Sequence, residues 1–568
     1  IIIMPKNVMK LVKPSPHRSR NDFDLSHRHI MSQNFGELIP ITQIETVPGD
    51  HIEISVANLL RCIPLVTSPF LRAKQHVDLW FVPYRDLWHS FENFITQKEQ
   101  PVSSALHSAA YLPNIDIHSL YNNVKYDSSF TDIVGRDPFV TSRKLLNYLG
   151  YADYTHSPSS NPYRVNLFRL AAYNYIWYNE YRQQYYDDGL RGLTAAQTNA
   201  AILFNFDDVN CDTYANSLLT STPGWPNRVM AMCQMRYRCW KKDLFTGLMP
   251  ATQFGAVSTF GGVSQLMRST DYEKFTVAGS SNPPTGISAG ELYMSSNNSY
   301  PINNASPVVD TTIDILALRK SEALQIWREN AMRAGNRVKD NMMAHYGVAS
   351  DFRDHRPTYI GSVDAPINIG DVMATANSDY SGNTNPNTNV GDIAGKGTST
   401  LNDNLFKFDA KDFGVIMAIS SILPEAEYNA YGVDRMNQLL ESEDFFVPEY
   451  ENLGLEAVSS LNFVGSPTNV AKVIGYAPRY FGYKTKLDKC FGSFMGNGIF
   501  APWCSPKTDV SNALATPTVM PLSCLYVNPA LYNVNFSVSI SNSDQFLNDC
   551  YFDVDAVRPM SVLGLPFS

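Results

Sequence analysis

The sequence predicts an all-β protein in which the strands are joined by long loops and accompanied by a few helices. Several short runs alternate apolar and polar residues with a period of two, as a half-buried strand does. Prolines are frequent, 34 in 568 residues, and many of them lie between those runs. No unit recurs at a fixed period, which argues against a propeller or a solenoid.

Five runs are strand candidates, and they cover 51–56, 77–83, 413–419, 534–540 and 551–557. The first and the last two alternate cleanly, so each predicts a strand with one buried face. Residues 77–83 are apolar and aromatic, and Pro83 ends the run. Residues 413–419 contain no polar position, which predicts a strand that is buried on both faces.

The first helix candidate covers 166–186 and is unusually aromatic. Leu170, Tyr173, Trp177 and Tyr181 follow one another at helical spacing and therefore lie on one face. Such a stripe is more often core than a platform for a ligand. We therefore predict that this face is buried.

The second helix candidate covers 321–345 and places apolar residues from Leu324 to Val338 in one line. Its basic residues are Arg319, Lys320, Arg328, Arg333, Arg337 and Lys339. We interpret these cations as a side that faces solvent or another subunit.

Three stretches, 152–163, 278–307 and 374–404, have the composition of loops, because Ser, Asn, Pro and Gly dominate them. Loops of thirty residues are uncommon in compact proteins and are usually functional or disordered. Strands resume after each stretch, so we expect decorations on a β scaffold rather than linkers between domains.

Composition and charge restrict the classes of function. Apolar residues make up 44% and charged residues only 17%, so a large core is available and much of the surface is polar but uncharged. A net charge of −9 excludes a protein that is basic throughout and binds nucleic acid over its whole surface. No apolar run is long enough to cross a membrane, and we identify no secretory signal.

Residues 1–30 nevertheless form a basic segment, with six Lys and Arg against two Asp. One interpretation is a solvated tail, and the other is an arm that lies against a polyanion. The basic residues that would contact phosphate are Lys6, Lys10, Lys13, Arg18 and Arg20.

The search for chemical motifs returns little. Gly286–Gly290 matches the GxSxG pattern, but a Pro-rich loop precedes it where a nucleophile elbow needs a strand. Gly395–Thr398 lacks the earlier glycine of a phosphate-binding loop. The eight cysteines form no CxxC pair and are interpreted as reduced, mostly buried residues.

Two polar clusters are candidates for a metal or catalytic site. His27 and His29 have no partner at ligand spacing, so a polar segment before a strand is the favoured interpretation. Asp351, Asp354 and His355 are interleaved with arginines, which favours a structural ion-pair cluster. We therefore assign no catalytic residue, no cofactor-binding residue and no metal ligand, and expect a structural protein rather than an enzyme.

Several segments, in the same order along the chain, resemble the major capsid proteins of the Microviridae, of the gokushovirus-like or a related Bacteroidetes-phage branch. The most specific is Trp-Lys-Lys-Asp-Leu-Phe-Thr-Gly-Leu-Met-Pro at 240–250. The others are 22–29, 35–40, 81–88, 168–180, 345–348, 356–357 and 558–560.

The resemblance implies a single eight-stranded antiparallel jelly roll, built from 31–250 and 313–568, with long loop insertions. It implies a surface insertion at 251–312 that projects at the threefold axes and serves host attachment. The stretch 374–404 has no counterpart that we can map, and a second exposed insertion is one interpretation of it.

The resemblance also implies a T=1 shell of sixty copies around circular single-stranded DNA, assembled in the cytoplasm of a bacterial host and present in the virion. Its implied partners are the genome, a small basic DNA-binding protein, a DNA pilot protein and a host surface receptor, with no membrane insertion. The alternatives are an all-β carbohydrate-binding adhesin or lectin, for which the polar loops would bind, and an all-β glycosidase, which needs two converging carboxylates.

Overall fold

The computed structural model describes most of the predicted β scaffold. The described residues are 20–88, 91–96, 112–116, 137–151, 164–187, 232–253, 315–334, 338–347, 356–373, 375, 393–402, 405–464, 472–496, 498–514 and 520–562. Contacts divide the chain into two compact units, one made of 1–252 and 349–568 and the other of 253–348.

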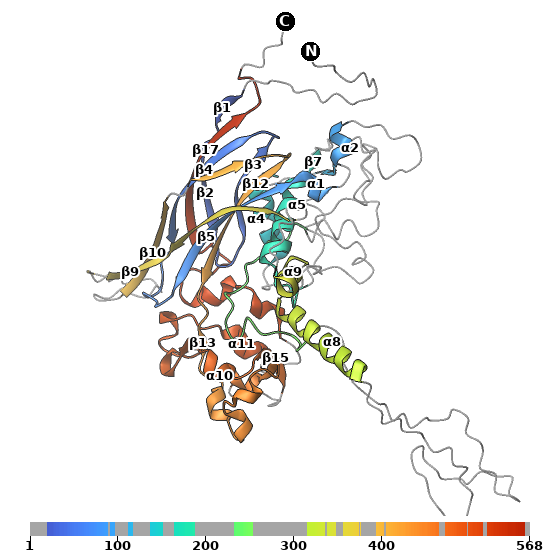
Figure 1. Ribbon diagram of the computed structural model, residues 1–568. Helices are drawn as coiled ribbons and strands as arrows, with labels where there is room; N and C mark the ends of the chain where they lie inside the picture. The colour runs from blue at the N-terminus through green and yellow to red at the C-terminus, as the bar shows by residue number, and fades with distance from the viewer. Residues whose placement is uncertain are drawn as a thin grey trace, which may run out of the picture. The chain divides into compact units, whose positions relative to one another are not determined.

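The larger sheet of the first unit has seven antiparallel strands. They are β1 (Asn21–Asp24), β2 (His27–Gln33), β4 (His51–Cys62), β9 (Asn368–Met373), β10 (Ile393–Asn402), β11 (Phe406–Asp409) and β17 (Phe546–Arg558). The order is β1-β17-β4-β10-β9, with β2 beside β1 on β17 and β11 beside β10 on β4. The beginning and the end of the chain therefore meet at one sheet position, where Asn21 pairs with Arg558 (Figure 1).

The smaller sheet has four antiparallel strands. They are β3 (Ile39–Thr46), β5 (Ala73–Pro83), β8 (Thr358–Pro366) and β12 (Gly414–Pro424). Their order is β3-β12-β5-β8, so neighbours in the sheet are far apart along the chain. Such pairing is typical of strands that alternate between two sheets rather than following one meander.

The inner faces of both sheets contribute to one hydrophobic core. Ile52, Ile54 and Val56 of β4 are buried, while the residues between them are partly exposed, as their alternation predicts. The same core contains Phe552 of β17 and Ile416 of β12. Each apolar side chain of this size contributes roughly 1.5–3 kcal/mol when it is fully buried. The fold is therefore mostly sheet, with few helices.

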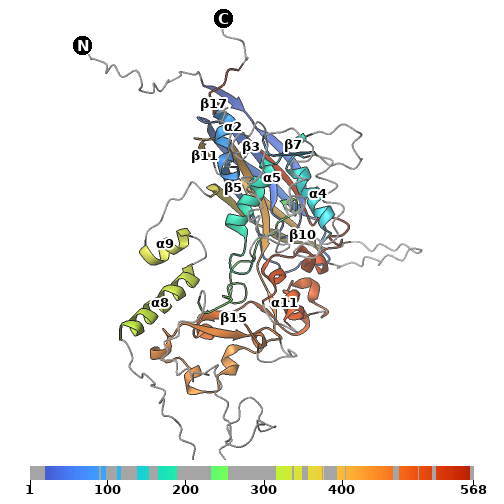
Figure 2. The same ribbon diagram turned by 90° about the vertical axis from the view of Figure 1, so that its right-hand side faces the viewer.

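Helices cover the other face of the smaller sheet. They are α1 (Tyr84–Leu87), α2 (Phe91–Thr96), α4 (Pro138–Tyr148) and α5 (Phe168–Ile176). Contacts join α5 and α1 to β5 and β12, and α4 to β3 (Figure 2). This cover is why β12 is buried at nearly every position, as the apolar run 413–419 predicts.

The aromatic helix is shorter than predicted. It continues from α5 as one π-helical turn, Trp177–Tyr181, and ends where Arg182 adopts an extended conformation. Leu170, Tyr173, Trp177 and Tyr181 are all buried, which confirms that the aromatic stripe is core. Two short strands, β6 (Asn114–Asp116) and β7 (Arg164–Asn166), pair with each other, and β7 ends just before α5 begins.

A long excursion between β12 and β17, residues 425–545, forms a second layer with its own core. We refer to it as the β12–β17 connection. Its strands and α-helices are β13 (Tyr428–Asn429), β14 (Leu455–Ser459), β15 (Val473–Pro478), β16 (Lys489–Cys490), α10 (Phe481–Lys484) and α11 (Thr508–Ala513). Its 3-10 turns are η3 (Arg435–Gln438), η4 (Ser442–Asp444), η5 (Pro448–Tyr450), η6 (Ser460–Asn462), η7 (Gly492–Phe494), η8 (Ala501–Trp503), η9 (Leu522–Leu525) and η10 (Pro529–Val534).

The described part of the second unit, 253–348, is helical. The predicted helix 321–345 is two helices, α8 (Ile315–Ala334) and α9 (Val338–Tyr346). Residues 335–337 between them lie outside the described residues. Trp327 of α8 stacks on His345 of α9, with ring centroids 6.0 Å apart.

Two predictions about boundaries are wrong. Residues 534–540 are not a strand, because Val534 and Val538 are exposed while Phe536 between them is buried, and 529–534 form a 3-10 turn. The stretch 374–404 is not all loop, because 393–402 form β10. Within the segment 1–30 that we assigned to the arm, 21–24 form β1 and 27–30 lie in β2.

Candidate assembly surface

The predicted DNA-contacting residues are mostly beyond the described part of the chain. Lys6, Lys10, Lys13 and Arg18 lie outside the described residues, while Arg20 is described and exposed. Arg20 stands directly before β1, at the sheet position where β1 pairs with the end of β17. The basic segment therefore joins the scaffold at the β1 edge of the larger sheet.

The histidines near the N-terminus are structural. One ring nitrogen of His27 lies 2.8 Å from the Leu25 carbonyl and the other lies 2.7 Å from the Thr42 hydroxyl. His29 Nδ1 lies 2.8 Å from the carbonyl of Ile41. These contacts fix β2 against β3 and use three of the four ring nitrogens, so they support no metal site.

Of the remaining motifs, the structure describes only one. Gly286–Gly290 and the cluster of Asp351, Asp354 and His355 lie outside the described residues. Gly395–Thr398 lies within β10, where its backbone pairs with β9. A phosphate-binding loop needs free N–H groups that converge on an anion, which a paired strand does not offer.

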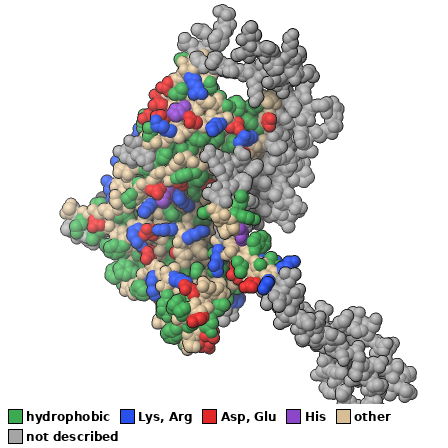
Figure 3. Space-filling view, viewed as in Figure 1, with side chains coloured by type: hydrophobic (Ala, Val, Ile, Leu, Met, Phe, Trp, Pro, Cys, Tyr) green, Lys and Arg blue, Asp and Glu red, His purple; other side chains and the backbone are tan. Residues whose placement is uncertain are grey.

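The β12–β17 connection exposes an unusual number of large apolar side chains. Ten of them lie between 431 and 500, and we refer to this set as the assembly surface: Tyr431, Leu440, Phe445, Phe446, Leu453, Val473, Tyr483, Phe491, Ile499 and Phe500. Figure 3 shows hydrophobic side chains gathered over this lower part of the first unit. Where exposed apolar side chains form a contiguous patch, the patch marks a site of contact with other molecules.

Leu440 is the most exposed member, with 89% of its surface accessible, yet the backbone around it is fixed. Asp444 accepts hydrogen bonds from the backbone N–H groups of Leu440 and Glu441, at 2.9 and 3.1 Å. Arg435 donates to Asp444 at 3.2 Å and to Glu456 at 2.8 Å. Because the backbone is already fixed, covering this side chain costs less conformational entropy than ordering a mobile loop would.

Electrostatics reinforce that arrangement. The backbone N–H groups of Leu440 and Glu441, together with Arg435, hold the pKa of Asp444 below its usual value. Burial opposes the charge of Arg435, but Glu456 and Asp444 outweigh it and raise the pKa of Arg435. The loop is therefore held by charged partners near neutral pH.

A left-handed residue shapes the neighbouring part of the surface. Tyr480 has φ of +60°, and its N–H donates to Glu456 Oε2 at 2.9 Å. Its ring lies 5.3 Å from that of Phe446, between centroids. A tyrosine in this conformation is costly, so its surroundings must stabilise it. The same glutamate thus anchors both Arg435 and Tyr480.

The conspicuous segment 240–250 connects the β12–β17 connection to the rest of the first unit. Asp243 accepts a 2.6 Å hydrogen bond from the Tyr428 hydroxyl, and Trp240 donates to the Tyr526 carbonyl at 3.0 Å. Phe245 is fully buried in the core of the connection. The segment therefore has a structural role, in fixing the base on which the assembly surface stands.

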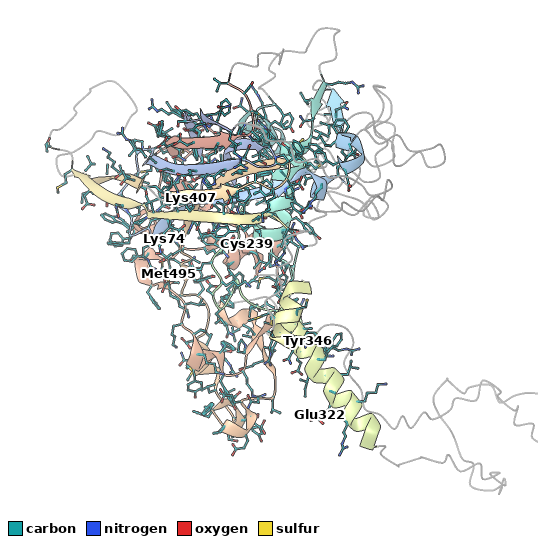
Figure 4. All side chains as sticks on the ribbon, turned by 45° about the horizontal axis from the view of Figure 1, so that its top comes forward. Lys74, Cys239, Glu322, Tyr346, Lys407 and Met495 are labelled. Atoms are coloured by element: carbon teal, nitrogen blue, oxygen red, sulfur yellow. The ribbon has the colours of Figure 1, made fainter. Side chains whose placement is uncertain are left out.

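The outer face of the larger sheet carries a row of carboxylates. Asp24, Asp555 and Glu53 are opposite one another on β1, β17 and β4. Lys407, labelled in Figure 4, continues the row and lies 2.6 Å from Glu53. Desolvation and then the neighbouring carboxylates raise the pKa of Asp555. Like charges opposed across strands cost stability.

Sequence reasoning missed the assembly surface, because its residues are scattered among short turns with no periodicity. The available signal was the low charge and the abundance of tyrosine, which pointed to contact without placing it. In the part of the chain that the structure describes, no helix combines the length and the apolar character needed to cross a membrane.

The chain is similar to known capsid proteins. The model of the family described as capsid protein (F protein) matches residues 12–567. The capsid protein VP1 of Chlamydia phage 1 is 22% identical over 626 residues, covering 97% of this chain and 96% of the relative. The capsid protein VP1 of Bdellovibrio phage phiMH2K is 24% identical over 569 residues, with the same shares covered. The capsid protein VP1 of Spiroplasma virus 4 is 22% identical over 390 residues, covering 64% and 62%.

Proposed function

Because the chain belongs to the capsid protein (F protein) family and is a Microviridae capsid protein, we propose that sixty copies form a closed T=1 icosahedral shell around circular single-stranded DNA. The observation that carries the assembly part is the assembly surface, whose most exposed apolar side chain stands on a loop fixed by ion pairs. Contacts repeated by symmetry favour apolar and polar groups over like charges.

The scaffold of each copy is a single eight-stranded jelly roll in this proposal. Its two sheets would follow the orders β2-β17-β4-β10 and β3-β12-β5-β8, with β1 extending β2 and β11 extending β10. Along the chain, β2, β4, β10 and β17 lie in one sheet and β3, β5, β8 and β12 lie in the other, and this distribution supports the assignment. A jelly roll leaves its loops free to diverge without disturbing the core.

The basic segment is proposed to contact the genome. The residues that would neutralise phosphates are Lys6, Lys10, Lys13, Arg18 and Arg20. Because the rest of the chain is acidic, a small basic protein would neutralise the other phosphates of the genome. Removing residues 4–19 leaves β1 and its pairing with β17 in place. We expect particles of the truncated chain to retain less DNA, measured by absorbance and by nuclease-protected length, while the unfolding temperature is unchanged.

The insertion at 251–312 is proposed to be the exposed, receptor-binding part of the virion and to project at the threefold axes. Its support is its loop composition and its position, mostly within the separate unit 253–348. The DNA pilot protein and the assembly in the host cytoplasm belong to the same proposal. Deleting 278–307 should leave particles intact and reduce attachment to host cells.

Electron microscopy of the purified full-length chain tests the proposal as a whole. We expect uniform closed particles, with one mass in multi-angle light scattering. Dispersed monomers or small oligomers under every assembly condition would contradict it. If such oligomers bound an array of glycans, the result would support the carbohydrate-binding alternative instead.

A further inference from the structure

Three potential metal ligands from distant parts of the sequence converge in the β12–β17 connection. They are the carboxylate of Glu427 and the thiols of Cys490 and Cys504, whose ligating atoms all lie within 4.8 Å of one another. Cys490 Sγ is 3.8 Å from Glu427 Oε2. No other group of three such ligands occurs among the described residues. The sequence analysis assigned no metal ligand, because these residues have no recognisable spacing.

Hydrogen-bonded backbone holds the three residues in register. Residues Tyr428 and Asn429 of β13 pair with Lys489 and Cys490 of β16 in parallel. On the other side of this strand, Glu427 forms a parallel bridge with Pro506, two residues after Cys504. Three neighbouring backbone segments therefore each supply one ligand, and the middle one supplies the carboxylate.

We propose that Glu427, Cys490 and Cys504 bind one divalent cation of the zinc class. Two thiolates with a carboxylate favour zinc over calcium or magnesium, which prefer oxygen ligands alone. Zinc–sulfur bonds of about 2.3 Å place the ligand atoms of a tetrahedral site roughly 3.8 Å apart. The 3.8 Å between Cys490 and Glu427 already meets this spacing, and the remaining adjustment is small. On binding, each thiol releases its proton to solvent as its sulfur–metal bond forms.

Ser505 supplies an independent observation at the same place. It is only 5% exposed, and its hydroxyl has no hydrogen-bond partner among the described residues. Its backbone N–H donates to Glu427 Oε2 at 3.3 Å. A buried hydroxyl without a partner is costly in an apolar surrounding, so a ligand nearby would satisfy it.

One arginine near the proposed site offsets part of its charge. Two thiolates, one carboxylate and a doubly charged cation leave one negative charge. Arg72 acts electrostatically on Glu427 and is held by Glu425 at 2.9 Å and Asp488 at 2.6 Å, so its charge is shared among three carboxylates. Metal ligands are commonly supported by such second partners, which orient them.

The cation would connect segments that carry the assembly surface. Phe491 follows Cys490 directly, and Ile499 and Phe500 precede Cys504 in the same turn region. A metal that joins these segments stabilises their arrangement before a neighbouring copy arrives. This consequence rests on the proposed function, whereas the binding of metal does not.

Metal analysis of the purified full-length chain tests the binding. After expression with zinc and extensive dialysis, mass spectrometry of the metal content should find about one zinc per chain. The variants Cys490→Ser and Cys504→Ser should lose it, while Cys62→Ser, which changes a half-buried thiol outside the cluster, should keep it. Cobalt(II) added to the zinc-free chain should produce the charge-transfer absorption of thiolate–cobalt bonds in the unsubstituted chain and in Cys62→Ser only.

Further outcomes separate the proposal from its rivals. Glu427→Gln keeps an oxygen for the Ser505 N–H but should weaken zinc binding at least tenfold in a chelator competition. If the unsubstituted chain contains no zinc, shows no cobalt band and titrates two fewer thiols than expected, Cys490 and Cys504 form a disulfide and the metal proposal is wrong. It is equally wrong if zinc content is the same in all cysteine variants. Zinc bound normally by a chain that never forms particles would overturn the proposed function and leave the site intact.

Discussion

Lys144 of α4 and Glu37, which precedes β3, form an ion pair with 2.6 Å between Nζ and Oε2. Glu37 is completely buried and Lys144 is nearly so, with 14% of its side chain exposed. Asp544, which precedes β17, lies 2.9 Å from the same ammonium group. One cation therefore joins a helix to segments from both ends of the chain.

Replacing Lys144 by Met should destabilise the first unit by about 3 kcal/mol, because two carboxylates lose their buried cation. Burial opposes ionisation of Asp544, but Lys144 and hydrogen bonds hold the pKa of Asp544 below its ordinary value of 3.8. A lowered pKa contributes stability above that value, and the contribution is lost as the pH falls through the folded-state pKa.

Denaturant unfolding at pH 7 and below pH 3.8 measures both effects. The difference between Lys144→Met and the unsubstituted chain should shrink in acid. Lys74→Met removes an exposed cation (Lys74 is labelled in Figure 4) and should change stability by less than about 0.5 kcal/mol. If both variants lowered the free energy of unfolding equally, the buried pair would contribute no more to stability than an exposed cation does.

Gly36 permits a close backbone approach that no other residue allows. Its φ is +73°, and an added Cβ would lie 2.5 Å from Val527 Cβ and 2.7 Å from Val527 O. Gly36→Ala should therefore cost about 3 kcal/mol or more, from strain and overpacking together. Gly492 has φ of +60° with nothing within 4 Å, so Gly492→Ala should cost only about 1 kcal/mol. Thermal unfolding of both variants separates the clash from the backbone strain.

Asp555→Asn should raise the unfolding temperature slightly. It removes one charge from the carboxylate row, where desolvation and then the neighbouring carboxylates raise the pKa of Asp555. A raised carboxyl pKa costs stability as the pH rises through the interval above 3.8, so the gain should fade in acid. Asp549→Asn is the opposite control, because Arg28 lowers the pKa of Asp549 and this variant should be slightly destabilised. A lower unfolding temperature for Asp555→Asn at neutral pH would contradict the repulsion.

Leu440→Ser should reduce the yield of particles at least tenfold while leaving the unfolding temperature of the free chain unchanged. Leu440 contributes nothing to the core of its own chain, since 89% of it is exposed. Leu547→Ser on β17 is the matched control, because Leu547 is 53% exposed but lies outside the assembly surface. Sedimentation of assembled material quantifies both, and equal losses would show that the surface has no special role.

Asp444→Ala probes the fixation of that side chain rather than its contact area. The loop then loses the acceptor of the N–H groups of Leu440 and Glu441 and one partner of Arg435. We expect assembly to slow several-fold, followed by light scattering, while the final particles are normal. An unchanged rate would mean that the loop is equally ordered without the carboxylate.

The regular part of the fold was accessible from sequence for a physical reason. Alternation at 51–56 and 551–557 and the apolar run 413–419 report burial on one or both faces of a strand, and all three are confirmed. The run 534–540 alternates equally well but is wrong, because Asn535 donates to the carbonyls of Pro502 and Cys504 and holds the chain in a turn. Such tertiary hydrogen bonds leave no local pattern.

The sites were less accessible. Both sites join residues that are far apart along the chain, so no sequence spacing predicts them. They are the pair of Lys144 and Glu37 and the cluster of Glu427, Cys490 and Cys504. The arm residues Lys6, Lys10, Lys13 and Arg18 lie outside the described residues, and their contact with DNA stays a prediction. The segment 240–250 and the other segments that resemble the capsid family predicted the family, because they combine rare residue types in a fixed order.

A cryo-electron microscopy map of the assembled particle tests the central claim most directly. It should show a closed icosahedral shell in which Leu440, Phe491 and Ile499 are buried against neighbouring copies. A shell whose subunit contacts leave the assembly surface facing solvent, or a chain that forms no symmetric particle, would contradict the account.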